Sequence, residues 1–298
     1  MSNIAFIPYN FPFNVSPTPN GIMVLLGGIT SSSAYSNAVD KYDYTANTMT
    51  TGALLLNSRG GNSRAASNKV FAVVAGDVTP GPSAATDKYY FAVDIVESGA
   101  TLQTSTWVGC YVCYGSADEA IFMYNPVNRV HRNRYQYASD TNLYTATGSS
   151  NRSTTWGASG PGVGLAVGGS SSSASTEFYD FSSHTRSAGP VTPATMSGQG
   201  TGLSNTSVAI FTRATTNKVT YKYDWATGAW TTAGSLSLAR NLPGGGSTAT
   251  IGVVFGGTST GGGTSDVYNF ATDVVTTGAS LINPKRDMGV ACDAPGNL

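Results

Sequence analysis

Aromatic side chains recur along this chain at alternating positions and at a nearly constant interval. Each copy is a tyrosine, one intervening residue and a second aromatic residue. The copies are Tyr42-Asp43-Tyr44, Tyr89-Tyr90-Phe91, Tyr135-Gln136-Tyr137, Tyr179-Asp180-Phe181, Tyr223-Asp224-Trp225 and Tyr268-Asn269-Phe270, and their first tyrosines are 47, 46, 44, 44 and 45 residues apart. Six copies at a nearly fixed period indicate a repeat architecture. Because residues i and i+2 of a strand share a face, each copy predicts a strand with two rings packed toward a neighbouring sheet.

A residue suited to a tight turn follows each aromatic pair at the third position. These residues are Asn47, Asp94, Asp140, His184, Gly228 and Asp273. Their types adopt positive φ most readily, and hairpin turns require such a residue. The pattern therefore predicts a β-hairpin after every aromatic pair.

Apolar segments that end in small residues precede the aromatic pairs, for example at residues 22–28, 163–169 and 251–257. Four predicted strands per unit of about 45 residues are typical of a propeller blade. Residues 285–294 match the position of residues 58–66, which open the second unit. We therefore predict that the C-terminal strand pairs with the N-terminal strand and closes a ring of six blades, which leaves no open sheet edge. Residues 20–298 are expected to form this all-β domain, with minimal helix. The glycine run at residues 244–246 is expected to precede a strand.

The order of Gly-Gly, Tyr-Asp and Trp in the repeat resembles the kelch repeat family over nearly the whole chain. The resemblance is clearest in Gly27-Gly28 with Tyr42-Asp43, in Gly168-Gly169 with Tyr179-Asp180, and in Gly256-Gly257 with Tyr268. The units around Tyr89 and Tyr135 depart from it, with Gly76-Asp77 and Asn125-Pro126 in place of the glycine doublet. The resemblance implies a kelch-like, six-bladed β-propeller.

Low charge limits the partners that this chain can attract. Charged residues make up 11% of the 298 residues, the formal net charge is zero, and glycine contributes 36 residues. A neutral surface rich in Gly, Ser and Thr does not attract nucleic acid or anionic membranes. No apolar run approaches the ~20 residues of a membrane span, and the N-terminus lacks the pattern of a secretory signal. We therefore expect synthesis in a host cytoplasm, without membrane insertion.

Cysteine usage agrees with a reducing site of synthesis. Cys110, Cys113 and Cys292 are too few for a disulfide framework. An offset of three places Cys110 and Cys113 on opposite faces of a strand, so we expect buried small side chains and not a zinc or redox pair. No cofactor and no metal site are predicted.

Residues 1–19 lie outside the repeat and are predicted to form an extended arm, because proline blocks both helix and ladder pairing. The arm combines four prolines with the aromatic residues Phe6, Tyr9, Phe11 and Phe13. Four aromatic side chains in so short a segment require a covering surface. Two interpretations remain open: the arm lies across its own propeller, or it docks onto another chain.

One predicted loop carries a concentration of positive charge. Arg129, His131, Arg132 and Arg134 fall within residues 125–134, which are predicted to join the second and third strands of the third blade. Arginine forks match carboxylates and phosphates, so this loop is a candidate site for an anionic sugar or an acidic partner. The alternative is an ordinary solvated charged surface.

A second group of cations is predicted to begin the inner strands, near the central channel. These residues are Arg59, Arg64, Arg240, Lys285 and Arg286. We expect them to satisfy backbone carbonyls and neighbouring carboxylates of the scaffold.

The known propeller enzymes provide a test for catalysis. A copper radical oxidase needs two histidine ligands, but this chain has only His131 and His184, and His184 is assigned to a turn. Sialidases carry an Asp box, and residues 149–156 resemble a degenerate copy that lacks both its Asp and its Gly. No nucleophile and base occur at a recognisable spacing, so we expect no enzymatic activity.

The low charge, the abundance of Ser, Thr and Gly, the aromatic arm and the absent export signal together resemble bacteriophage virion proteins of the tail-fibre or decoration type. This resemblance implies a structural and adhesive role, with assembly partners bound through residues 1–19 and a loop face presented for host attachment. It also implies an extracellular location after release. The alternatives are a stand-alone glycan-binding lectin, a sialidase-like glycosidase and an intracellular kelch adaptor.

Overall fold

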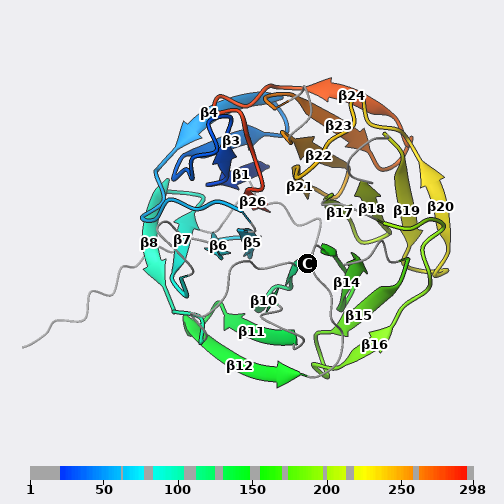
Figure 1. Ribbon diagram of the computed structural model, residues 1–298, viewed down its shortest axis with the longest axis horizontal. Helices are drawn as coiled ribbons and strands as arrows, with labels where there is room; N and C mark the ends of the chain where they lie inside the picture. The colour runs from blue at the N-terminus through cyan, green and yellow to red at the C-terminus, as the bar shows by residue number, and fades with distance from the viewer. Residues whose placement is uncertain are drawn as a thin grey trace, which may run out of the picture.

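The computed structural model describes residues 21–61, 63–76, 83–103, 112–124, 130–147, 155–169, 174–196, 200–212, 218–257 and 262–293. Within these ranges the regular secondary structure consists of strands, arranged as six four-stranded sheets around an axis (Figure 1). The chain is therefore an all-β, six-bladed propeller, as the repeat predicted. No helix in the described ranges is long and apolar enough to cross a membrane.

Each blade is an antiparallel sheet whose strands follow one another from the axis outward. Blade 1 contains β26 (Gly289–Cys292), β1 (Ile22–Leu26), β3 (Val39–Asp43) and β4 (Thr48–Gly52). Blade 2 contains β5 (Arg64–Ser67), β6 (Phe71–Ala75), β7 (Thr86–Tyr90) and β8 (Ile95–Gly99). Blade 3 contains β9 (Val112–Gly115), β10 (Glu119–Tyr124), β11 (Val130–Gln136) and β12 (Thr141–Thr147).

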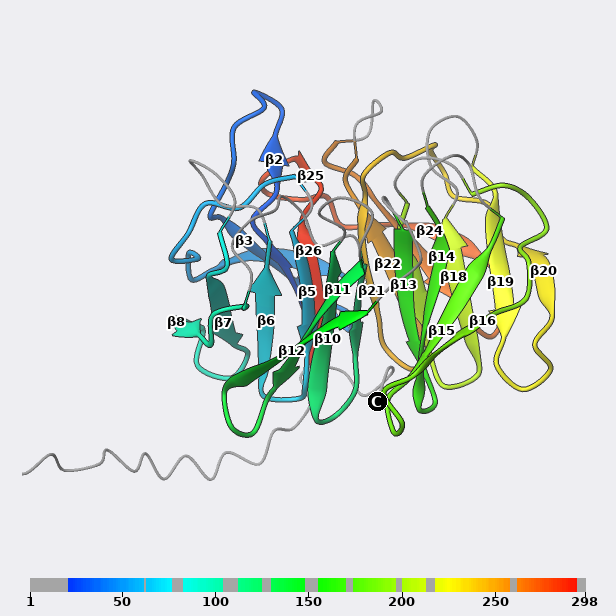
Figure 2. The same ribbon diagram turned by 60° about the horizontal axis from the view of Figure 1, so that its bottom comes forward.

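The remaining blades follow the same order. Blade 4 contains β13 (Thr155–Gly160), β14 (Val163–Gly168), β15 (Thr176–Asp180) and β16 (Arg186–Ala188). Blade 5 contains β17 (Gly202–Ser204), β18 (Val208–Thr212), β19 (Thr220–Asp224) and β20 (Trp230–Ala233). Blade 6 contains β21 (Gly244–Ser247), β22 (Ile251–Phe255), β23 (Ser265–Asn269) and β24 (Val275–Gly278). A small two-stranded sheet of β2 (Ile29–Thr30) and β25 (Lys285–Arg286) lies at one end of the propeller (Figure 2).

The innermost strand of blade 1 comes from the opposite end of the chain. β26 pairs antiparallel with β1, with Met23 opposite Cys292 and Leu26 opposite Gly289. On its other side β1 pairs with β3. β26 also contacts β5 and β21, the inner strands of the two adjacent blades. The first and last described strands therefore share one sheet, which is the pairing that the repeat predicted.

The aromatic pairs pack as expected for rings on one face of a strand. Tyr42 and Tyr44 have ring centroids 5.4 Å apart, and Tyr179 and Phe181 have centroids 5.5 Å apart, both edge to face. The first tyrosine of each pair is at most 5% exposed. Edge-to-face geometry is favourable for neighbouring rings, so these side chains contribute both buried area and specific contacts within each blade. Tyr42 also meets Phe255 of blade 6 edge to face, with centroids 5.2 Å apart.

Positive φ occurs at every predicted turn residue. The values are 51° at Asn47, 52° at Asp94, 49° at Asp140, 56° at His184, 71° at Gly228 and 57° at Asp273. The six hairpins predicted from residue type are therefore confirmed.

The glycine run at residues 244–246 forms the inner strand β21 itself, which corrects the expectation that it precedes a strand. A Cβ atom on Gly245 would lie 2.7 Å from Cγ2 of Thr201, and one on Gly244 would lie 2.6 Å from Cγ2 of Val290. Contacts this short do not occur between real Cβ atoms and their neighbours. The inner strands approach one another so closely near the axis that a side chain at Gly244 or Gly245 would displace its neighbours.

Candidate functional site

We call the contact between two adjacent blades a seam, and four of the six seams share a polar pattern. At the seam between blades 1 and 2, the hydroxyl of Tyr89 donates to Oδ1 of Asp94 over 2.5 Å. The same carboxylate accepts the backbone N–H of Ala53 at 2.8 Å and Nζ of Lys41 at 2.5 Å, both from blade 1. Burial alone would raise the pKa of Asp94, but these three donors outweigh it and lower that pKa below its ordinary value.

The seam between blades 2 and 3 repeats this arrangement. Asp140 accepts the backbone N–H of Ala100 at 2.9 Å and Nζ of Lys88 at 2.7 Å, and it accepts the hydroxyl of Tyr135. Lys222, Asp273 and Tyr268 form the corresponding contacts between blades 5 and 6. In each case the cation directly precedes the tyrosine of one blade and reaches the turn carboxylate of the next.

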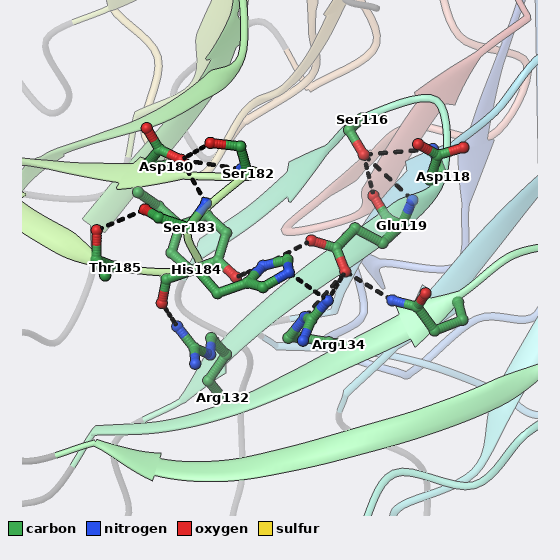
Figure 3. Close-up of polar contacts among 12 residues, drawn as sticks. Ser116, Asp118, Glu119, Arg132, Arg134, Asp180, Ser182, Ser183, His184 and Thr185 are labelled. Carbon is green, nitrogen blue, oxygen red and sulfur yellow. Dashed lines mark hydrogen bonds and ion pairs between the residues drawn. The ribbon is translucent and has the colours of Figure 1, made fainter.

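The seam between blades 3 and 4 replaces the lysine by Arg134 and the turn carboxylate by His184. Nη2 of Arg134 lies 2.8 Å from Nε2 of His184 (Figure 3). Because arginine can only donate, Nε2 of His184 is the acceptor of this contact. Nδ1 faces the hydroxyl of Tyr179 at 3.0 Å and Oε1 of Glu119 at 3.4 Å.

Glu119 supplies the negative charge of this seam. Its Oε2 accepts Nε of Arg134 at 2.9 Å, Nη2 of Arg134 at 2.8 Å and Nε2 of Gln136 at 2.6 Å. The Glu119 side chain is 5% exposed and that of Arg134 is 18% exposed. A carboxylate this well buried needs such donors, because an isolated charge is costly away from water.

Arg132 is a buried cation that contacts a backbone carbonyl and an aromatic ring of blade 4. Its Nη1 donates to the carbonyl of His184 at 2.8 Å, and its guanidinium carbon lies 5.1 Å from the centre of the Tyr179 ring. Nε of Arg132 has no hydrogen-bond partner among the described residues, although the residue is only 5% exposed. Burial lowers the pKa of Arg132; Tyr179 opposes this effect, and Arg134 and Arg186 add to it. The interaction with the ring offsets part of the desolvation cost.

These placements change the interpretation of the predicted charged loop. The loop was expected to extend to residue 134, but β11 begins at Val130, so Arg132 and Arg134 are strand residues that face blade 4. His131 also lies in β11, whereas Arg129 and the side chain of His131 fall outside the described part of the chain. The structure brings Arg132 and Arg134 together around His184, for which the sequence predicted only a turn.

The predicted role of the inner cations is confirmed for four of them, Arg59, Arg240, Lys285 and Arg64. Arg59 donates Nε to Oδ2 of Asp87 at 3.0 Å and Nη1 to the carbonyl of Gly76 at 2.7 Å. Arg240 likewise donates Nε to Oδ2 of Asp266 at 2.9 Å and Nη1 to the carbonyl of Gly256 at 2.8 Å.

The third of these cations is Lys285, whose Nζ donates to the carbonyl of Leu25 at 3.0 Å and lies 3.5 Å from Oδ2 of Asp40. Burial lowers the pKa of Lys285 to about 8, against the opposing effect of Asp40. The three carboxylates, Asp40, Asp87 and Asp266, each precede a repeat tyrosine by two residues. That constant spacing is the signal in the sequence that marks them as partners of the inner cations.

A hollow of about 90 Å³ lies where the inner strands meet. Arg64, Thr155, Trp156, Thr201 and Met288 are among its lining residues. Nη1 of Arg64 bonds to the carbonyl of Ser63 at 2.7 Å and to Oδ1 of Asp287 at 3.2 Å. The hollow can hold several water molecules but is smaller than the usual site for a drug-sized ligand.

Within the described ranges, no three metal-binding side chains lie close enough together to hold an ion. Cys292 is buried and its Sγ lies 3.0 Å from the carbonyl oxygen of Ser247, while Cys110 lies outside the described residues. Phe6, Tyr9, Phe11 and Phe13 also lie outside them.

Comparison with known protein families and with curated proteins found no match for this chain. Its function must therefore be inferred from its own residues and contacts.

Proposed function

We propose that this protein is a non-enzymatic structural and adhesive component of a larger assembly, and specifically a bacteriophage virion protein of the tail-fibre or decoration type. The observation that carries the proposal is the use of charge at the seams. Lys41, Lys88, Arg134 and Lys222 each bridge two adjacent blades. Because these cations hold neighbouring blades together, the propeller is suited to act as a stiff platform for variable loops.

The kelch-like character of the repeat belongs to the same proposal. The glycine doublets at residues 27–28, 168–169 and 256–257 all have positive φ, which other residues rarely adopt. The repeat tyrosines are buried, and five of them are hydrogen-bonded to the side chain of the following turn residue, for example Tyr42 to Oδ1 of Asn47 at 2.8 Å. These features support a kelch-like subtype built on the six-bladed fold.

In this proposal residues 1–19 bind other virion or assembly proteins, and a loop face of the propeller meets the host surface, where a glycan is the candidate ligand. The protein is made in the host cytoplasm and acts outside the cell after release. The support is the pairing of an aromatic arm with a stiff body of low charge content and zero formal net charge. No membrane insertion and no nucleic-acid contact are part of the role.

The test is to delete residues 1–19 in cells that produce the complete particle. We expect the deleted protein to keep its thermal unfolding midpoint but to be missing from purified particles. Incorporation at the normal level would contradict the assembly role. Capsid or tail genes beside the coding gene would support the class, and a fluorogenic sialoside panel should show no turnover.

A glycan-binding lectin is the second candidate, and the hollow at the axis is the observation that favours it. Its lining residues include the aromatic Trp156, the hydroxyl-bearing Thr155 and Thr201, and the cationic Arg64. Polar groups of this kind combined with an aromatic side chain suit a sugar. Strong binding on a glycan array that survives deletion of residues 1–19 and is lost in Arg64→Ala would favour the lectin over the assembly role.

A further inference from the structure

The hollow at the axis is lined by the inner strands of blades 1, 2, 4, 5 and 6 and by residues that lead into them. Arg64 is the one cation among its described lining residues, and none of these residues carries a carboxylate. The others are hydroxyl-bearing, aromatic, apolar or glycine residues. The hollow is partly open to solvent, so a ligand can enter it. Its described walls therefore offer donors and a positive charge, with no negative side chain to repel an anion.

Arg64 keeps one edge of its guanidinium available. Its side chain is 21% exposed, and it uses Nη1 for the carbonyl of Ser63 and for Oδ1 of Asp287. Nε and Nη2 have no hydrogen-bond partner in the described part of the chain, and neither atom is buried away from solvent. These two N–H groups form a planar edge that matches the two oxygens of a carboxylate. Because Asp287 already balances the charge of Arg64, a ligand with a single negative charge fits better than one with two.

Thr201 offers a second donor to the hollow. Its backbone groups bond to Thr212, but its hydroxyl makes no hydrogen bond within the part of the chain that the structure describes. A Cβ atom on Gly245 would lie 2.8 Å from Oγ1 of Thr201, and both residues line the hollow. A hollow of about 90 Å³ holds only a few water molecules, so a small ligand that replaces them reaches several walls at once.

The backbone beside the hollow is held in an unusual conformation. Leu242 and Asp287 have φ of 60° and 54°, although neither is a glycine and neither is one of the predicted turn residues. They directly precede Pro243 and Met288, which line the hollow, and the N–H of Asp287 donates to the carbonyl of Leu242 at 2.8 Å. Positive φ at residues with a side chain is costly and gathers at ligand sites. The strain therefore marks this end of the axis as a candidate binding site.

We propose that the hollow binds a single carboxylate group, through Nε and Nη2 of Arg64 and the hydroxyl of Thr201. The ligand is a monocarboxylic acid, either a small free acid or an acidic sugar that inserts its carboxylate. This assignment goes beyond the assembly role of residues 1–19 and does not need it. It narrows the glycan-binding candidate to acidic sugars, and for that candidate it rests on the same hollow.

The experiment titrates the full-length, nitrogen-15-labelled protein with sodium acetate, sodium glucuronate and glucose, with sodium chloride keeping the ionic strength constant. Glucose has the ring of glucuronate without its carboxylate. The reporters are the indole N–H signal of Trp156 and the backbone N–H signals of Gly202 and Gly245, all from the lining. The internal controls are the indole signals of Trp225 and Trp230, which donate to carbonyls outside the lining. We expect acetate and glucuronate to shift the reporters and not the controls, and glucose to shift neither.

Variants of the two donors test which groups hold the ligand. Arg64→Gln removes the charge, whereas Arg64→Lys keeps a cation beside Asp287 but lacks the planar fork, and each should raise the Kd for acetate at least about tenfold. Thr201→Val removes only the hydroxyl and should raise this Kd about threefold to tenfold. The matched control Arg186→Gln removes an arginine that pairs with Glu177 away from the lining, and it should leave the Kd unchanged.

Three results would overturn the proposal: reporters that do not respond to acetate, an equal response to glucose, or an unchanged Kd in both Arg64→Lys and Thr201→Val. These two variants keep the partner of Asp287, so the test does not depend on the folding of Arg64→Gln. Binding of acetate without glucuronate would support the site with a small free acid as its ligand and would remove the glycan-binding candidate. Particle incorporation is measured separately, so the assembly role of residues 1–19 and the carboxylate site fail independently.

Discussion

Arg59 and Asp87 form an ion pair from which solvent is fully excluded, with Nε of the arginine 3.0 Å from Oδ2 of the aspartate. Arg59 precedes the inner strand of blade 2, and Asp87 lies in β7 of the same blade. The arginine also donates Nη2 to the carbonyl of Ala85 at 3.0 Å. The Arg59 side chain thus holds the segment that leads into blade 2 against strand β7 of that blade.

Substitution Arg59→Met should lower the free energy of unfolding by roughly 3–5 kcal/mol, because it leaves the charge of Asp87 buried and unpaired. Denaturant unfolding followed by circular dichroism measures this loss. The control is Lys41→Met, whose pair with Asp94 has side chains 23% and 38% exposed and should cost less than about 1 kcal/mol. Adding Asp87→Leu to Arg59→Met should recover part of the lost stability, because it removes the unpaired buried charge. Equal losses of stability in Arg59→Met and Lys41→Met would contradict the prediction that the buried pair matters more than the exposed one.

Substitution Glu119→Gln should weaken the seam between blades 3 and 4 by roughly 3–5 kcal/mol, because Arg134 loses its buried counter-charge. The matched change Glu97→Gln removes a carboxylate that is 53% exposed and 3.9 Å from Lys88, and should cost less than about 1 kcal/mol. Denaturant midpoints of the two variants provide the comparison. Unchanged stability of Glu119→Gln would show that the seam does not depend on this charge.

Lys285 should make stability rise with pH across a defined window. Its pKa is lowered to about 8 in the folded protein by burial, while the unfolded chain keeps a value near 10.5. Between these values the unfolded state binds more protons, so stability increases with pH by at most about 1.4 kcal/mol per pH unit. The contribution is fully present above the unfolded value and is lost as pH falls through about 8.

The difference in unfolding free energy between the native chain and Lys285→Met isolates this effect. We expect that difference to grow in favour of the native chain from pH 8 to pH 9.5. A difference that is constant over this interval would show that Lys285 does not titrate there.

The core tyrosines should produce the opposite dependence at higher pH. Burial raises the pKa of Tyr179 to about 12, with Arg132 opposing, and burial together with the bond to Asp94 raises the pKa of Tyr89 above its ordinary value. Stability from these groups is complete below pH 10 and is lost as pH rises through the folded pKa.

As the pH is raised, we therefore expect the tyrosinate absorbance of the folded protein to stay below that of the chain unfolded in guanidinium. The absorbance should then rise steeply as the protein unfolds. Absorbance and circular dichroism recorded on the same samples test this. Gradual ionisation near pH 10 without loss of structure would contradict the burial of these hydroxyls.

Sequence reasoning succeeded where a residue's role is local. The positive φ at Asn47 and Asp94 follows from residue type and spacing, and the contact between Tyr42 and Tyr44 follows from the two-residue period of a strand. It failed at Arg132 and Arg134, which were expected in a loop but lie in a strand against blade 4. The sequence shows two arginines close together, but it does not show that blade 4 places His184 and the ring of Tyr179 against them.

The sequence by itself determined the number of blades, the strand and turn pattern within each blade, and the strand at the C-terminus that pairs with β1. These features depend on periodicity, which is a property of the chain alone. Only the tertiary structure decided the partners across each seam, because those contacts join residues about 50 positions apart whose separation depends on how two blades pack.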